Sequence, residues 1–231
     1  MKTRSSCSPH QQVIQDFLQY LNSQSSDYIL KGDNSLTTCY GLDRESSDID
    51  LDSLNKLAIK NLIEKYCESK SYSFRVAKDT DTVKRYMIDY GDSGHPLKIE
   101  ISYRRKNINK EDYHKINNIN VYTINIIAGM KTNAYLSRDK IRDLYDVVFI
   151  CESYWDELSK DRKEQILEAF DYKGLEQFDY LVENSEEIPS DIDLEKLADS
   201  FLSVYERIGI NASEEERKIA RGKESDPNVD I

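Results

Sequence analysis

The sequence predicts an α+β protein in which a mixed sheet with flanking helices is followed by a C-terminal helical bundle. Up to about residue 124, short segments with alternating apolar residues, such as Leu97–Tyr103, are separated by turn residues, as is typical of strands. From Ile124 onward the apolar residues recur at helical spacing. We therefore expect a sheet domain over residues 1–124, a helical bundle domain over 125–211 and a flexible tail over 212–231.

The sheet domain is expected to begin with a helix. Ser8 and Pro9 provide an N-cap and a first helical residue, and the apolar pattern ends near residues 22–26. Another helix is expected over 54–69, and a strong turn signal covers 91–96. Strands are expected over 28–31, 47–52, 72–77, 82–90, 97–103 and 120–123, with a loop over 104–115.

The helical part is expected to contain five helices. Their expected ranges are 125–136, 138–152, 156–170, 173–184 and 191–208. Ser137 is a candidate N-cap for the second of them, and Gly209 is expected to end the last one.

Charge is divided unevenly along the chain. Residues 1–150 hold 22 Lys and Arg against 20 Asp and Glu, whereas residues 151–231 hold 10 against 23. The net charge of −11 therefore belongs to the last third, and it does not exclude nucleic-acid binding by the first part, because such binding depends on local patches. The acidic third is either a set of solvated helix faces or a surface for a basic partner.

The composition favours a cytoplasmic protein without a membrane partner. No apolar run approaches the length of a membrane span, and the N-terminus lacks the apolar centre of a signal peptide. Four widely spaced cysteines and three isolated histidines favour free thiols over a disulfide framework or a zinc site.

The stretch Tyr28–Ser53 combines two features that suit a nucleotide with its metal. It reads as a short strand, a turn at Gly32, a short helix, a second turn, and a strand that carries Asp48 and Asp50. A helix N-terminus attracts anions, and alternate carboxylates attract hard cations. A nucleoside triphosphate (NTP) bound with magnesium needs both.

Asp48 and Asp50 are expected to project from the same side of their strand, because they are two residues apart. Glu100 lies on the polar face of the strand expected over 97–103. If these two strands are neighbours, the three carboxylates can hold two Mg²⁺ (or Mn²⁺) ions. An Asp-x-Asp pair also occurs on exposed strands without a metal, so spacing alone leaves both readings open.

Together these residues resemble the AbiEii/AbiGii toxin-like nucleotidyltransferases, a branch of the polymerase-β-type superfamily. The resemblance covers residues 28–150. Its matching residues are Lys31, Gly32, Leu36, Tyr40, Gly41, Arg44, Ser46, Asp48, Ile49, Asp50 and Leu51, then Glu100, Lys131, Arg138, Arg142, Asp143 and Asp146.

The resemblance implies a polymerase-β-like mixed sheet and transfer of a nucleotidyl group from an NTP to an acceptor hydroxyl. The 3′ end of a tRNA is the favoured acceptor, ahead of a protein or a small molecule. The implied role is the toxin of a toxin–antitoxin or phage-defence pair, with an antitoxin protein as a partner. We expect the active site to lie between the two domains.

The resemblance also implies roles for single residues. Its catalytic and metal-binding residues are Asp48, Asp50 and Glu100. Its nucleotide-binding residues are Gly32, Asp33, Ser35, Lys131 and Arg138. Read without the resemblance, Lys131 and Arg138 are also compatible with solvated surface charge, and Arg142 and Asp143 with an ion pair on a helix.

One departure from the family pattern bears on activity. Asp33 and Asn34 stand where the family has a glycine and a threonine that bring the phosphates close. Asp33 adds negative charge there, although it could instead meet a metal or cap the short helix, and Ser35 could supply the missing hydroxyl. The alternative function is therefore a catalytically weakened nucleotide- or partner-binding module.

The segment 104–115 is a further candidate for nucleic-acid contact. It is rich in basic residues, namely Arg104, Arg105, Lys106, Lys110 and Lys115, with Tyr103 and Tyr113 beside them. Such a loop could bind RNA phosphates and stack a base, or it could be an ordinary exposed loop.

Overall fold

The computed structural model describes residues 8–55, 59–91, 95–185 and 188–224, with 210–224 described for the backbone only. The chain divides into two compact units, Met1–Met130 and Lys131–Ile231. Their boundary falls inside helix α4 (Ile124–Ser137). The domain limits expected at 124 and 211 stay predictions.

Within the described residues, the first unit is built on a seven-stranded mixed sheet with the strand order β3-β4-β5-β2-β1-β7-β6. The strands are β1 (Tyr28–Lys31), β2 (Asp48–Ser53), β3 (Ser73–Asp79), β4 (Val83–Asp89), β5 (Leu97–Ser102), β6 (Tyr113–Ile116) and β7 (Ile119–Tyr122). β2 pairs in parallel with β5 and β1 with β7, whereas the other neighbours are antiparallel. The predicted α+β class is confirmed.

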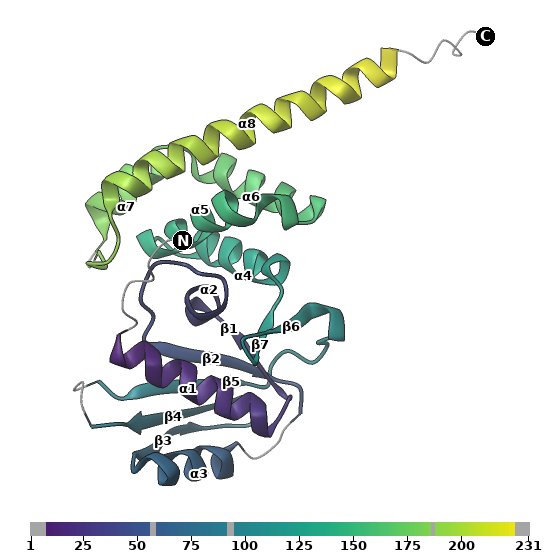
Figure 1. Ribbon diagram of the computed structural model, residues 1–231. Helices are drawn as coiled ribbons and strands as arrows, with labels where there is room; N and C mark the ends of the chain where they lie inside the picture. Colours follow the sequence, from purple (N-terminus) through teal and green to yellow (C-terminus); the bar gives the residue numbers. More distant parts are fainter. Residues whose placement is uncertain (1–7, 56–58, 92–94, 186–187, 225–231) are drawn as a thin grey trace. The chain divides into compact units, whose positions relative to one another are not determined.

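Helix α1 (Pro9–Gln24) begins where the sequence predicted. Ser8 accepts a hydrogen bond from the backbone N–H of Gln11, and Pro9 takes the first helical position. The helix packs against α3 (Lys60–Lys70) and β7, and Figure 1 shows it crossing in front of the sheet. Its buried face consists of Ile14, Phe17, Leu18 and Leu21.

Two expectations for this unit extend past the described residues. Residues 56–58 of the helix expected over 54–69 lie outside them, and α3 is assigned from Lys60. Residues 92–94 of the turn expected over 91–96 also lie outside them.

The segment 104–115 contains regular structure that the sequence reading missed. It holds the 3-10 turn η1 (Lys110–Asp112) and most of β6. The prediction of a loop was wrong because β6 is an edge strand whose His114 and Lys115 are exposed, so it lacks the alternation of a half-buried strand. The turn after it is formed by Asn117 and Asn118, both with positive φ, which is typical of a tight hairpin.

The second unit is helical. After α4 it contains α5 (Ile141–Tyr154), the 3-10 turn η2 (Trp155–Glu157), α6 (Lys160–Lys173), α7 (Gln177–Asn184) and α8 (Leu194–Glu224). Helix α5 packs against α7 and α8, and α6 packs against α8. Aromatic side chains from three helices meet in its core, namely Tyr135, Phe170, Phe201 and Tyr205.

Two predicted helix ends in this unit were wrong. Ser137 is the last residue of α4, and Lys140 takes the N-cap position of α5. Gly209 does not end α8, because it lacks the positive φ of a C-cap glycine and a glycine inside a helix costs only about 1 kcal/mol. The backbone is helical to Glu224, residues 225–231 lie outside the described residues, and flexibility of the tail stays a prediction.

No helix in the described part of the chain combines the length and the apolarity that crossing a membrane requires.

Candidate active site

The three predicted carboxylates come together on the central strands of the sheet. The parallel register of β2 and β5 sets Asp50 opposite Glu100 and Asp48 opposite Lys98. The antiparallel register of β1 and β2 sets Asp50 opposite Lys31. The strands predicted over 47–52 and 97–103 are therefore neighbours, as the three-carboxylate arrangement requires. The residues that alternate with these side chains are buried apolar ones: Ile49, Leu51, Leu97, Ile99 and Ile101.

Two of these carboxylates are bound by cationic side chains of the same sheet. The Nζ atom of Lys98 lies 2.5 Å from Oδ2 of Asp48. Arg85 donates from Nε and Nη2 to Oε2 of Glu100, over 2.9 and 2.6 Å. Across the described residues, no three His, Cys, Asp or Glu side chains are grouped closely enough to hold one ion. Because both cationic side chains are partly exposed, they can move away when another cation binds.

Asp50 differs from its two neighbours. Among the described residues, no side chain or backbone group makes a hydrogen bond or ion pair with its carboxylate. Burial raises its pKa, and the Glu100 and Asp48 carboxylates act in the same direction, whereas Lys98 and Lys31 lower it. Asp50 is thus a desolvated carboxylate between two others, an environment that favours binding of a proton or a metal cation.

Gly32 is required where β1 meets the Asp50 side chain. Its φ is +72°, and a Cβ atom built on it would lie 2.8 Å from Oδ2 of Asp50. Any side chain at this position would therefore collide with the carboxylate. The close approach explains on physical grounds why a glycine stands at this turn.

Asp52 is a structural residue. It is buried, and it accepts hydrogen bonds from Nζ of Lys31 over 2.5 Å and from the Tyr122 hydroxyl over 2.8 Å. Burial and the Asp52 carboxylate raise the pKa of Tyr122, so its hydroxyl stays a donor. Asp52 therefore ties β2 to β1 and β7 beside the candidate site.

Asp33 is matched by a cation from the same motif. It is the first residue of helix α2 (Asp33–Cys39), and its carboxylate lies 3.1 Å from Nη2 of the buried Arg44. The added negative charge is therefore partly compensated. Ser35 is buried, and its hydroxyl donates to the Gly32 carbonyl oxygen over 2.6 Å, so in this geometry the hydroxyl supports the turn.

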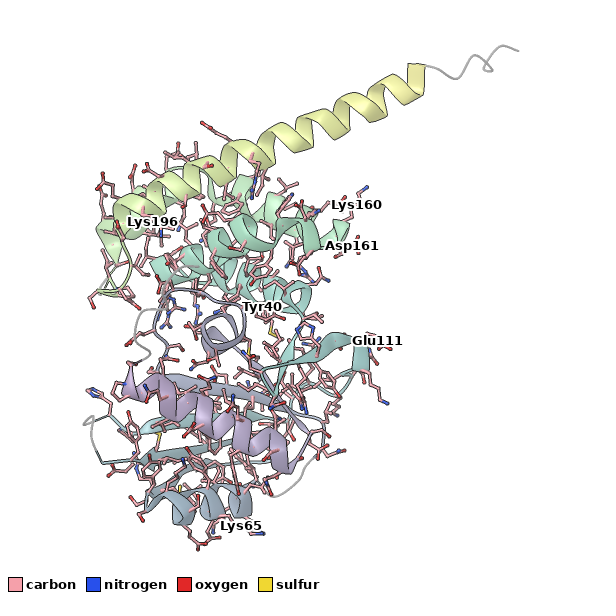
Figure 2. The ribbon with its side chains drawn as sticks, in the orientation of Figure 1. Tyr40, Lys65, Glu111, Lys160, Asp161 and Lys196 are labelled. Carbon is pink, nitrogen blue, oxygen red and sulfur yellow. The ribbon has the colours of Figure 1, made fainter. Side chains whose placement is uncertain are left out.

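Two further side chains of the motif hold the surroundings of the carboxylates. Asn34 is fully buried, and its Nδ2 donates to the backbone carbonyl of Asp48 over 2.5 Å. Tyr40, labelled at the end of α2 in Figure 2, donates its hydroxyl to the carbonyl of Tyr122 over 2.7 Å. Sequence reasoning missed the contact of Asn34, because the spacing of residues 34 and 48 does not show that they meet.

In the second unit, the basic residues of the family motif bind its acidic residues. Lys131 is buried with its Nζ 2.6 Å from Oδ2 of Asp146. Arg138 binds Asp143 through two hydrogen bonds of 2.6 and 2.7 Å. Both carboxylates are fully buried. Lys131 therefore joins α4 to α5, and Arg138 joins the residue after α4 to α5. The reading of Lys131 as solvated surface charge was wrong.

The basic segment 104–115 is only partly available for nucleic acid. Tyr103 is buried, so its ring is not available to stack a base. Arg105 lies over the ring of Tyr122, 4.9 Å from its centroid, and 4.0 Å from the carboxylate of Asp112. Contact of the remaining basic residues with RNA stays a prediction.

Comparison with known proteins identifies the family. The model of the nucleotidyl transferase AbiEii toxin family, of type IV toxin–antitoxin systems, matches residues 16–228. The chain belongs to this family. The AbiEii match confirms the resemblance seen over residues 28–150 and extends it through the helical unit.

Two solved structures share the fold of this AbiEii protein. JHP933 from Helicobacter pylori has a TM-score of 0.73 at 23% identity, covering 94% of this chain and 100% of that one. A candidate nucleotidyltransferase from H. pylori has a TM-score of 0.72 at 23% identity, covering 92% and 98%. Among curated proteins, none matches this chain.

Proposed function

We propose that this AbiEii-family protein transfers a nucleotidyl group from an NTP to an acceptor hydroxyl, with the 3′ end of a tRNA as the favoured acceptor. The observation that carries the proposal is the environment of Asp50. This carboxylate is desolvated, lies opposite Glu100 and two residues from Asp48, and has no hydrogen bond among the described residues. A protein or a small molecule is the next acceptor to consider.

The chemistry of the donor set suits a divalent cation, which these side chains would hold once Lys98 and Arg85 move away. Asp48, Asp50 and Glu100 offer carboxylate oxygens, the ligands that Mg²⁺ and Mn²⁺ prefer. When bound there, the metal would lower the pKa of the attacking hydroxyl and balance charge on the phosphates. Without a metal, Lys98 and Arg85 neutralise Asp48 and Glu100. A cation at Asp50 would balance the charge of a carboxylate whose pKa is raised by burial and by the Glu100 and Asp48 carboxylates.

Nucleotide binding is proposed for Gly32, Asp33, Ser35, Lys131 and Arg138. Gly32 supports this role because its lack of a side chain lets the chain at the start of α2 approach the Asp50 carboxylate closely. Of the two basic residues, Arg138 is the better candidate to contact a phosphate, because its guanidinium is partly exposed whereas Lys131 is buried. We assign Lys131 primarily to holding α4 against α5.

The proposed biological role is that of a growth-arresting toxin. Blocking tRNA 3′ ends would stop protein synthesis, and an antitoxin protein would be its partner. Its substrates would place the reaction in the cytoplasm. Support for this role comes from the AbiEii family match.

The direct test incubates the protein with each radiolabelled NTP, Mg²⁺ and total tRNA. Wild type is expected to label tRNA, and Asp48→Asn and Asp50→Asn are expected to lose at least a hundredfold of the rate, about 3 kcal/mol or more of transition-state stabilisation. Equal labelling by wild type and either variant would refute the catalytic assignment. Purified protein and small hydroxyl acceptors serve as parallel substrates.

A catalytically weakened binding module is the second candidate. It is favoured by one observation, that Asp33 places a carboxylate at the start of α2, where the resemblance leads us to expect a glycine. This reading predicts nucleotide binding without labelling of any acceptor. A measurable labelling rate that depends on Asp50 would exclude it.

A further inference from the structure

The backbone just before Asp50 is held by side chains from outside its strand. Three consecutive carbonyl groups accept hydrogen bonds from three side chains, and that of Ser46 accepts two, the second from Asn34 Nδ2 over 3.4 Å. Gln11 Nε2 donates to the Ser46 carbonyl over 2.7 Å, His10 Nε2 to that of Ser47 over 2.9 Å, and Asn34 Nδ2 to that of Asp48 over 2.5 Å. The side chains of His10, Gln11 and Asn34 are named the carbonyl clamp.

The carbonyl clamp lies beside the first residues of β2, which in the described part of the chain have no neighbouring strand on the β1 side. β1 ends at Lys31, opposite Asp50, so Asp48 extends past the end of β1. On its other side β2 is paired with β5 from Asp48 onward. Asn34, which follows β1 almost directly, therefore supplies a donor to the overhanging end of β2, and the two residues of α1 continue the series. The buried Ser46 and the partly buried Asp48 need such partners for their carbonyls, whereas Ser47 is exposed.

The orientation of the Asn34 amide is fixed by its own neighbours. Its Oδ1 accepts hydrogen bonds from the hydroxyls of Thr37 and Thr38, over 3.2 and 3.4 Å. An amide whose oxygen is bound on one side presents its nitrogen on the other, which here faces the Asp48 carbonyl. Because Asn34 is fully buried, it has little freedom to turn.

The orientation of the His10 ring follows from the same logic. A carbonyl oxygen can only accept, so Nε2 must carry a proton to bind Ser47. Nδ1 lies 2.5 Å from the Tyr90 hydroxyl, which can donate to a neutral ring or accept from a charged one. The contact of His10 with Ser47 is therefore kept in both protonation states.

We propose that the carbonyl clamp positions the Asp48 and Asp50 carboxylates for a divalent cation. The clamp residues touch the backbone rather than the reacting groups, so they are positioning residues. Fixing the carbonyls of residues 46–48 fixes the direction in which both carboxylates leave the strand, and a metal site gains affinity from ligands that are already oriented. This inference rests on the metal site in the proposed function.

The test measures Mn²⁺ binding to the metal-free protein by the loss of the free-ion electron paramagnetic resonance signal. Asn34→Ala is expected to weaken Mn²⁺ binding about 10- to 100-fold, the range usual for groups that orient metal ligands. The matched control is Asn22→Ala. Asn22 is also buried, and its Nδ2 donates to a strand carbonyl, that of Tyr28, over 2.9 Å. Both variants should lower Tm, but Asn22→Ala should bind Mn²⁺ as wild type does.

A second pair of variants covers the case in which Asn34→Ala does not fold. His10 is only partly buried, so His10→Ala should fold and bind Mn²⁺ more weakly. His10→Gln should restore binding, because its amide can donate to Ser47. Equal Mn²⁺ affinity of wild type, Asn34→Ala and His10→Ala would overturn the clamp and leave the proposed function standing. No Mn²⁺ binding by wild type would overturn both, and equal weakening by Asn22→Ala would show a general effect of stability instead of a clamp.

Discussion

Asp50 lies among charges that pull its pKa in opposite directions. Burial and two carboxylates raise it, and two lysines lower it, with burial the largest cause. In the interval between the ordinary carboxyl pKa and this raised value, the folded protein holds a proton that the unfolded chain has released. Without a metal, the free energy of unfolding therefore falls as pH rises through that interval and stays lower above it.

We predict that Asp50→Asn is more stable than wild type at neutral pH in the presence of a chelator. The amide removes the buried charge, so the advantage should shrink as pH falls through the interval and vanish below the ordinary carboxyl pKa. Urea unfolding at a series of pH values measures the difference. The control is Asp48→Asn, which breaks a partly exposed ion pair with Lys98 and should lower stability by about 0–1 kcal/mol. A pH-independent difference for Asp50→Asn would contradict the role given to burial.

Gly32→Ala should cost both stability and activity. The φ of +72° makes alanine strained by roughly 1–3 kcal/mol, and the new Cβ would press on the Asp50 carboxylate. Gly41→Ala is the matched control, because Gly41 has a φ of +79° but nothing lies within 4 Å of its Cβ position. Urea unfolding should show a loss in both variants. Labelling of tRNA should be lost only in Gly32→Ala. Equal labelling by both variants would show that the close contact between Gly32 and the Asp50 carboxylate does not affect activity.

At the scale of elements, the helices α4 and α5 are joined through buried charge. Asp146 and Asp143 are fully buried; Asp146 binds Lys131 of α4, and Asp143 binds Arg138, the residue that follows α4. Removing one partner of such a pair leaves an uncompensated buried charge, whereas replacing both by apolar residues is often neutral. Comparing a single substitution in such a pair with a substitution of both partners therefore separates a structural role of the basic residue from a role in the reaction.

Lys131→Met is predicted to destabilise the protein by about 3–5 kcal/mol, because it leaves the Asp146 charge buried and unpaired. The double variant Lys131→Met/Asp146→Leu should recover most of that stability. Urea unfolding measures both changes, and labelling of tRNA is measured on the double variant. Recovered stability with near wild-type labelling would support the structural role. Recovered stability with labelling still lost would assign Lys131 to the nucleotide instead.

The elements that the sequence predicted well carry a local signal. Ser8 and Pro9 mark the start of α1 by capping chemistry, and the alternation around Ile99 marks β5 with its polar face. The missed β6 has no such signal, because an exposed edge strand is defined by its backbone pairing with β7. The predicted helix end at Gly209 was wrong because a C-cap glycine needs a left-handed backbone conformation, which Gly209 does not adopt.

The adjacency of the strands that carry the candidate carboxylates was predictable from the sequence, but the contacts of those carboxylates were not. Asp48, Asp50 and Glu100 follow from alternation and resemblance, and their strands are indeed adjacent. The ion pairs of Lys98, Arg85 and Arg44, and the hydrogen bond of Asn34, join residues that are 11 to 50 positions apart. Such pairings depend on sheet register and helix placement, which a single sequence does not fix.

At the scale of the whole molecule, charge and architecture change together along the chain. The sheet unit carries the carboxylate site and comes from the nearly neutral part of the sequence, whereas the helical unit contains the acidic excess. The basic segment 104–115, which contains most of β6, belongs to the sheet unit. An RNA acceptor is therefore better matched to the first unit than to the exposed faces of the second.

The last prediction concerns the whole chain and separates nucleotide binding from catalysis. A ligand that binds only the folded state at a hundred times its Kd stabilises it by about 2.7 kcal/mol. For a chain of 231 residues this corresponds to a rise in Tm of about 5–10 °C. The correct NTP with Mg²⁺ should produce such a rise in differential scanning calorimetry, and the NTP with a chelator should produce a smaller one. Asp50→Asn with Mg²⁺ should behave like wild type with the chelator.

A rise in Tm without labelling of any acceptor would support the weakened binding module. No rise in Tm at millimolar concentrations of any NTP would contradict nucleotide binding by this protein.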